Sequence, residues 1–370
     1  MATKSPLRVA FIGGRGVIGT YSGIESYYEE VGSRLASRGH HVTAYCRTHF
    51  TPDVHSYRGI TVRRLPSVSS KHLETLSHSV LSTADSLFRR FDIIQFHAIG
   101  SAFLSMIPRT LGTSTVVSVR GLDWRRAKWG TLAKSFLQFG EWASARCPTR
   151  TVVVSKFLQD HYRKAHGIEA DLIQNAVPIR DERPIERLKQ FGVEKRTYLL
   201  YAGRLSPEKG VHDLLEALRP LPRTTRLIIA GGSSHTDTYL ENLKKHAWGD
   251  VLFLGQVDRE FMGELLSNCY AFVLPSYMEG LSVGLLEAIS HGACILASGI
   301  PENVEAVDDA ALLFPPGDVA KLRDQLELVL NDSALAADYR KKARMRSGCL
   351  LDWDQVTDQT EGLYYGLVEG

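Results

Sequence analysis

The sequence has no long apolar segment. No apolar run reaches the roughly 18–20 residues that a membrane-spanning helix needs. The opening MATKSPLRVAF also lacks the apolar core of a signal peptide, because the run that starts at Leu7 is only as long as a strand. Hydrophobic residues make up 44% and charged residues 23% of the chain, which is typical of a soluble globular protein. Its length of 370 residues predicts two domains. We therefore expect a cytoplasmic protein.

Cysteine and metal-binding patterns are also scarce. The cysteines are odd in number and form no CxxC or Cys/His cluster with zinc spacing, so we expect reduced packing residues and no metal. They are Cys46, Cys147, Cys269, Cys294 and Cys349. Asp-x-Asp, a pattern that can chelate Mg²⁺ or Mn²⁺, occurs once, at residues 352–354. It lies near the C-terminus, next to Trp353.

Strand-like and helix-like segments alternate along most of the chain, which predicts α/β domains with mostly parallel sheets. The first set of expected strands covers residues 8–13, 41–47, 61–66, 92–98, 115–120, 150–155 and 171–175. The second set covers residues 198–203, 226–232, 251–255, 271–276, 293–298 and 311–316. The clearest helices of the first set are expected at 22–38 and 131–145. The polar, strand-free segment 178–197 is expected to connect the two domains.

Two glutamates, Glu279 and Glu287, flank the start of a predicted helix in PSYMEGLSVGLLEAISHG. The run 269–275 predicts a buried strand, and residues 282–291 predict a helix that ends at Gly292. A helix N-terminus binds phosphate well, and Glu287 would lie about 7–8 Å further along at 1.5 Å per residue. That separation matches the distance from a diphosphate to its ribose hydroxyls, so the pattern favours a nucleotide sugar. The alternative is an ordinary helix with one solvated glutamate.

This stretch resembles the Glu-x7-Glu motif of retaining glycosyltransferases of family 4, and the opening segment 8–47 resembles members of that family that build bacterial surface polysaccharides. Further resemblances lie at residues 152–162, 172–178, 201–218, 227–232 and 251–257, so the resemblance covers nearly the whole chain. The family implies a GT-B fold, with two Rossmann-like doubly wound domains that face each other across a cleft. The expected parts are an acceptor-binding domain at 1–180, a donor-binding domain at 181–350 and a helix at 351–370 that returns to the first domain. This packed helix implies a structural role for the Asp-x-Asp pattern at 352–354. The implied reaction is metal-independent transfer from a nucleotide sugar to a glycan or lipid-linked acceptor.

The resemblance also implies individual site residues. The expected catalytic residues are His97, Glu279, Arg204 and Lys209. The expected donor-binding residues are Gly14, Gly23, Arg204, Lys209, Gly280, Leu281, Ser282, Val283 and Glu287. Arg204 and Lys209 follow a strand in GRLSPEKG, where cations can stabilise a departing diphosphate. His97 also follows a strand, although a lone histidine there is commonly a packing residue.

The first domain departs from the family at Arg120, where many relatives carry a histidine. We expect Arg120 and Asp123 to contact the acceptor or an acidic sugar. The loop GRGVIG, which contains Gly14, is also a literal G-x-G-x-x-G motif and leaves open an NADP-linked oxidoreductase with Arg47 on the 2′-phosphate. A catalytically inactive nucleotide-sugar-binding protein is the third possibility.

Charge is divided unevenly between the two halves. Residues 1–180 carry 24 Lys and Arg against 12 Asp and Glu, whereas residues 181–370 carry 20 against 29. The basic segment 125–142 also contains Trp129, Phe136 and Phe139. Basic and aromatic side chains together favour an anionic membrane surface, and no nucleic-acid motif accompanies them. We expect peripheral binding to the inner face of the cytoplasmic membrane; the alternative is a solvated basic domain.

Overall fold

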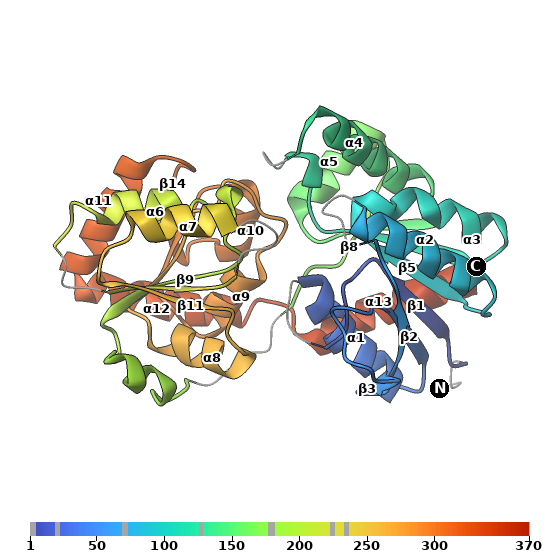
Figure 1. Ribbon diagram of the computed structural model, residues 1–370, viewed down its shortest axis with the longest axis horizontal. Coiled ribbons are helices and arrows are strands. Elements are labelled where there is room, and N and C mark those ends of the chain that lie inside the picture. Colours follow the sequence, from blue (N-terminus) through green and yellow to red (C-terminus); the bar gives the residue numbers. More distant parts are fainter. Residues whose placement is uncertain are drawn as a thin grey trace. The chain divides into compact units, whose positions relative to one another are not determined.

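Two runs of alternating strands and helices form two units in this computed structural model (Figure 1). The structure describes residues 5–18, 23–68, 73–125, 129–176, 182–222, 226–232 and 237–369. Unit 1 comprises residues 1–175 together with 351–370, and unit 2 comprises residues 176–350. The boundary expected at 180/181 lies outside the described residues.

Unit 1 contains an eight-stranded sheet in the order β3-β4-β2-β1-β5-β6-β7-β8. Its strands are β1 (Arg8–Ile12), β2 (His41–Arg47), β3 (Ser56–Tyr57), β4 (Ile60–Leu65), β5 (Ile93–His97), β6 (Ser114–Val119), β7 (Arg150–Val153) and β8 (Asp171–Leu172). All pairs are parallel except β3 with β4. The seven expected strands are confirmed, while the two residues of β3 are too few to show a periodic pattern.

Helices connect the parallel strands of unit 1. They are α1 (Gly23–Ser37), α2 (Glu74–Leu87), α3 (Met106–Thr110), α4 (Thr131–Arg146) and α5 (Lys156–His166), with 3₁₀ turns η1 (Ile99–Ser105) and η2 (Asp123–Arg125). The expected helix at 131–145 is therefore confirmed. The expected start of α1 at Ser22 lies outside the described residues. Within the described part of the chain, no helix combines the length and apolar character needed to cross a membrane.

The last helix of the chain, α13 (Trp353–Val368), belongs to unit 1 and packs against α1 (Figure 1). Asp352 caps it through a capping box with Gln355, and Trp353 is buried. Further along the helix, the Tyr364 hydroxyl donates to Gln95 on β5. These contacts explain the Asp-x-Asp pattern as the start of a packed helix, which supports the structural interpretation.

Unit 2 contains a six-stranded parallel sheet in the order β11-β10-β9-β12-β13-β14. Its strands are β9 (Tyr198–Ala202), β10 (Arg226–Ala230), β11 (Val251–Gly255), β12 (Ala271–Leu274), β13 (Ile295–Ser298) and β14 (Ala311–Phe314). Its helices are α6 (Val211–Leu218), α7 (Asp237–His246), α8 (Arg259–Asn268), α9 (Val283–Ser290), α10 (Pro301–Val307), α11 (Val319–Asn331) and α12 (Ser333–Ser347), with 3₁₀ turns η3 (Arg187–Phe191) and η4 (Pro207–Lys209). Figure 1 shows α6 and α7 on one face of the sheet and α8 on the other, as in a doubly wound fold. The two expected Rossmann-like domains are thus confirmed.

The polar segment before β9 is held on unit 2 by one buried carboxylate. Glu264 on α8 accepts hydrogen bonds from the backbone N–H groups of Glu186, Arg187 and Leu188, at 2.8–3.1 Å.

Four of the five cysteines are buried and all are free, so packing explains those four, while Cys349 is exposed.

Gly210 allows two loops of unit 2 to pack backbone against backbone. Its φ is +65°, and a Cβ there would lie 2.0 Å from the Pro275 carbonyl oxygen. Gly255, in the same unit, has φ +67° and open space where a Cβ would stand. We expect Gly255→Ala to cost roughly 1–2 kcal/mol from the left-handed backbone alone.

Gly210→Ala should cost at least about 1 kcal/mol more, because the loop must move to relieve the overlap. Urea denaturation of both variants measures the difference in the free energy of unfolding. Equal losses would mean that the contact between the loops is not tight.

Candidate active site

The loops that carry the expected donor residues lie at the switch point of the unit 2 sheet. β9 pairs with β10 on one side and with β12 on the other. The chain therefore winds outward from β9 to β11 and then returns to start again at β12, so the winding direction reverses between β9 and β12. In open α/β sheets, ligands bind at this point, beyond the carboxyl ends of the strands.

Close backbone packing fixes these loops around the switch point. The N–H of Tyr277, after β12, donates to the carbonyl of Glu208, after β9, at 3.0 Å. A Cβ on Gly231, after β10, would lie 1.8 Å from the Gly203 carbonyl oxygen. The start of α9 is also close, since a Cβ on Gly284 would lie 3.2 Å from the Ala202 carbonyl oxygen. Three strand ends and one helix N-terminus therefore meet at this edge.

We expect Lys209 to bind the diphosphate of the donor, and Glu279 its sugar. In this structure the two side chains form an ion pair with each other. The Lys209 ammonium lies 2.6 Å from both carboxylate oxygens of Glu279, and the Ser276 hydroxyl donates to Glu279 Oε1 at 2.7 Å. The side chains are 19% and 6% exposed, so the pair is largely shielded from water. Neither this pairing nor the role of Ser276 could be predicted from the sequence, because 70 residues separate the two charges.

Helix α9 lies within the predicted range 282–291, with Ser282 and His291 as its N-cap and C-cap. Ser282 caps it by accepting a hydrogen bond from the N–H of Leu285 at 3.4 Å, and Gly292 follows with φ +62°. Glu279 lies in the preceding loop and the half-buried Glu287 lies inside the helix. The other expected members of this stretch are half-buried Gly280, buried Leu281 and half-buried Val283. The predicted positions of the two glutamates, one before the helix and one within it, are therefore confirmed.

Arg204 is half-buried at the start of the loop after β9. Its carbonyl accepts a hydrogen bond from the buried Tyr201 hydroxyl at 2.9 Å. Burial, followed by the charge of Glu279, raises the pKa of Tyr201 well above its usual value. The hydroxyl thus stays protonated and holds the backbone of Arg204.

The switch point of unit 1 lies between β1 and β5, and His97 stands at the end of β5. Its ring is fully buried, with ring centroids of Phe11, Tyr27 and Tyr28 at 5.8, 5.2 and 4.9 Å. Neither ring nitrogen has a hydrogen-bond partner. Burial, aided by the charge of Arg120, lowers the pKa of His97 well below its usual value. A neutral imidazole can hydrogen-bond a sugar hydroxyl but cannot supply positive charge.

Arg120 is tied into the same cluster of unit 1. Its guanidinium donates to Asn175 Oδ1 and lies 4.6 Å from the centroid of the Tyr27 ring. Asp123 is half-buried at the start of η2. Arg120 thus adjoins His97, which the sequence did not predict because the two residues follow different strands.

The glycine-rich loop after β1 packs closely on its surroundings. The N–H of Gly14 donates to the Tyr28 hydroxyl at 3.0 Å, and a Cβ on Gly13 would lie 2.4 Å from the His97 carbonyl oxygen. Gly23 is the first residue of α1, whereas Gly19 lies outside the described residues. A phosphate bound by the Gly14 amide would have to replace the tyrosine.

Arg47 is not placed to bind a 2′-phosphate. Its guanidinium is buried, 3.1 Å from Glu74 Oε2 and 3.0 Å from the Thr75 hydroxyl. The charge that the NADP hypothesis requires is therefore already neutralised inside unit 1.

Among the described residues, unit 1 contains a potential metal-binding cluster. Glu141, His161 and His166 place their ligand atoms within 4.8 Å of one another. Burial opposes ionisation of Glu141, but hydrogen bonds from His161, His166 and Trp124 outweigh it and lower the pKa of the carboxyl. These residues match no zinc-binding sequence pattern, because Glu141 and His161 are 20 residues apart and His161 and His166 are 5 apart. They come together only through packing.

Comparison with known proteins gives matches to both units. The family described as "Glycosyl transferases group 1" matches residues 182–346, and "Glycosyl transferase 4-like domain" matches residues 22–175. Glycogen synthase of Mycobacterium tuberculosis is 36% identical over 178 residues, which are 46% of this chain and 43% of that protein. O-antigen chain mannosyltransferase B of Escherichia coli is 30% identical over 185 residues, 48% of each chain. The matches thus span less than half the length of these relatives.

Solved structures share the fold over almost the whole chain. Sucrose-phosphate synthase from Thermosynechococcus elongatus has a TM-score of 0.84 at 22% identity, covering 98% of this chain and 99% of that one. HepE of Anabaena in complex with UDP-glucose has a TM-score of 0.79 at 17% identity, covering 97% and 100%. At these identities the likeness concerns the fold.

Proposed function

Because this chain belongs to the GT-B glycosyltransferases of family 4, we propose that it transfers a glycosyl group from a nucleotide sugar to a glycan or lipid-linked acceptor. The observation that carries the proposal is the meeting of Lys209, Glu279 and the N-terminus of α9 at the switch point of unit 2. A cation and free helix N–H groups suit a diphosphate, and a fixed carboxylate beside them suits sugar hydroxyls. The UDP-glucose in the Anabaena protein of the same fold is consistent with such a donor.

The proposed reaction retains the configuration of the anomeric carbon. The bond from that carbon to the diphosphate oxygen breaks, and the acceptor oxygen bonds to the same face. The acceptor proton passes to the departing phosphate. Glu279 acts on the sugar hydroxyls and not as a nucleophile, because Lys209 and Ser276 already hold both of its oxygens.

The proposed leaving-group stabilisation uses protein charges without a metal. Arg204 and Lys209 lie in the loop after β9, and α9 begins beside the end of that strand. Cations and helix N-termini aimed at a developing phosphate charge lower the barrier without reorganisation. For the acceptor, we propose a contact with Arg120 and Asp123 in unit 1.

A panel of nucleotide sugars and NADP, screened by thermal shift and then by transfer to acceptors, tests the proposal. We expect one or a few nucleotide sugars to stabilise the protein and at least one to be consumed. Stabilisation without turnover would indicate an inactive binding protein. Stabilisation by NADP alone would overturn the assignment.

The two carboxylates should separate binding from turnover. Glu287→Ala should weaken nucleotide binding by roughly 1–3 kcal/mol, through the loss of hydrogen bonds to a charged acceptor. Glu279→Ala should lower turnover with less effect on nucleoside diphosphate affinity. Calorimetry and initial rates measure these effects, with the exposed Glu327→Ala as control. Wild-type transfer by both site variants would refute the site assignment.

Removing one cation should slow the transfer itself. Arg204→Met or Lys209→Met should reduce the rate on the order of 10²–10³-fold, as for loss of a preorganised charge at a developing anion. Lys245→Met, an exposed lysine of α7, serves as the control.

EDTA should leave wild-type activity at ambient temperature largely intact. Loss of activity in EDTA that Mn²⁺ restores would contradict the metal-free mechanism.

We also propose that unit 1 docks on anionic membranes through α4. Leu132, Phe136 and Phe139 recur at helical spacing and are 89%, 38% and 48% exposed, and Trp142 is 49% exposed. Arg125 is exposed in η2, the turn that precedes α4 in the sequence. An exposed apolar stripe next to basic residues suits an anionic bilayer surface. Of the basic residues expected to contribute, Arg126 and Lys128 lie outside the described residues.

Liposome co-sedimentation tests the docking. Binding to anionic vesicles should fall with salt and weaken when Arg125, Arg126 and Lys128 are replaced, because surface charge attraction is screened. The double variant Phe136→Ser, Phe139→Ser should also weaken binding to the vesicles. Phe88→Ser should not, since Phe88 is 91% exposed but lies at the end of α2. Equal binding to neutral and anionic vesicles, or none at low salt, would favour a soluble acceptor.

A further inference from the structure

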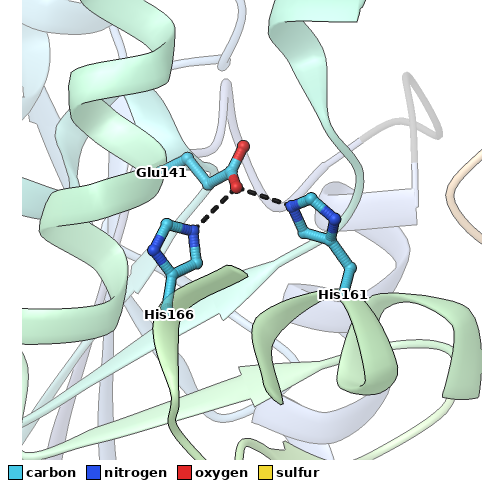
Figure 2. A group of neighbouring side chains, drawn as sticks. All are labelled: Glu141, His161 and His166. Atoms are coloured by element: carbon cyan, nitrogen blue, oxygen red, sulfur yellow. Dashed lines mark hydrogen bonds and ion pairs between the residues drawn. The ribbon is translucent and has the colours of Figure 1, made fainter. Parts of the chain in front are cut away.

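We propose that Glu141, His161 and His166 bind a zinc ion that fastens α4 to α5 in unit 1. The Nε2 atoms of His161 and His166 lie 2.7 and 2.8 Å from the same carboxylate oxygen, Oε1 of Glu141. Figure 2 shows both imidazole rings turned toward that oxygen. Two imidazole nitrogens and one carboxylate oxygen form a donor set that zinc accepts, with one position left for water.

The convergence of the two histidines does not follow from helix periodicity. On a regular helix, residues five apart point about 140° apart, since each residue turns the helix by about 100°. His161 lies within α5, whereas His166 is its last residue, before Gly167 in the left-handed conformation. The His166 imidazole nevertheless reaches Glu141 on α4, at 2.8 Å. A third contact, from the Arg146 guanidinium to the His166 carbonyl at 3.0 Å, holds the end of α5 in place.

The carboxylate is oriented from its other side. Trp124 Nε1 donates to Glu141 Oε2, which leaves Oε1 to face both histidines. Partners that fix a ligand in this way are typical of metal sites and strengthen them. The side chains of Glu141, His161 and His166 are 7%, 19% and 13% exposed. The site is thus enclosed but still open to an entering ion.

The spacing of the ligand atoms requires a small adjustment. Bonds of about 2.0–2.2 Å around a tetrahedral ion place neighbouring ligand atoms about 3.3 Å apart. The imidazoles must therefore move about half an ångström away from the carboxylate oxygen, given their present 2.7 and 2.8 Å. The ligand atoms now lie within 4.8 Å of one another, so the two histidine nitrogens must also adjust their separation to about 3.3 Å. Mg²⁺ and Ca²⁺ fit less well, because they prefer oxygen ligands.

The proposed ion has a structural role that is separate from donor chemistry. It would join the C-terminal half of α4 to the end of α5, where the Ser144 and Tyr162 hydroxyls already meet at 2.6 Å. Removing it should lower the thermal midpoint of the protein without removing any group from the donor site of unit 2. The zinc site and the transferase assignment can thus fail independently.

The test uses the full chain, freed of metal with a chelator and titrated with Zn²⁺ against a chromophoric chelator. We expect one tight equivalent and a rise in the thermal midpoint, because an ion that binds the folded state stabilises it. Co²⁺ in place of Zn²⁺ should give a visible spectrum of a four-coordinate ion. Mg²⁺ should give no shift.

Variants locate the ion. His161→Ala and Glu141→Gln should each weaken zinc binding by more than about 10-fold and abolish the thermal shift. Glu141→Gln keeps a hydrogen-bonding side chain at that position, so it should fold even if His161→Ala does not. It then tests zinc binding by itself. His49→Ala, which breaks a single His–Glu pair with Glu74 in the same unit, should retain the tight equivalent. No tight equivalent in the wild type, or tight binding in both site variants, would show that the three residues form only a hydrogen-bonded cluster.

Discussion

The ion pair between Lys209 and Glu279 joins the two loops on which the proposed donor site depends. One partner follows β9 and the other follows β12, so the pair bridges the switch point of the unit 2 sheet. It neutralises a carboxylate that is only 6% exposed, and a buried charge without such a partner would be costly. The same pair keeps an ammonium group beside the N-terminus of α9. In the proposed reaction, that ammonium would also bind the diphosphate, and the carboxylate would stay in place for the sugar hydroxyls.

Unit 1 uses the same topology for a different chemical environment. Its switch point contains a neutral, fully buried His97 among three aromatic rings, and Arg120, which contacts Asn175 and Tyr27. Neither nitrogen of this fully buried ring has a hydrogen-bond partner, so a ligand hydroxyl could bond to it only after the surrounding rings move. The two units therefore offer complementary chemistry, with charge pairing in unit 2 and aromatic packing around a neutral imidazole in unit 1.

Much of the fold could be predicted from the sequence, because buried parallel strands are short apolar runs between turn residues. The runs at 8–13 and 198–203 predicted β1 and β9, and Ser282 and Gly292 marked both ends of α9. Pairings between distant side chains could not be predicted in this way. Lys209 with Glu279, and Glu141 with its two histidines, meet only after helices and strands have packed.

Hydrogen–deuterium exchange of the full chain, with and without a nucleoside diphosphate, tests the central claim most directly. If the diphosphate binds at the switch point of unit 2, backbone amides in residues 203–210 and 280–286 should gain protection, because bound phosphate engages free N–H groups there. Protection confined to residues 13–18 of unit 1, or none at a saturating concentration that calorimetry shows to bind, would contradict this account of the donor site.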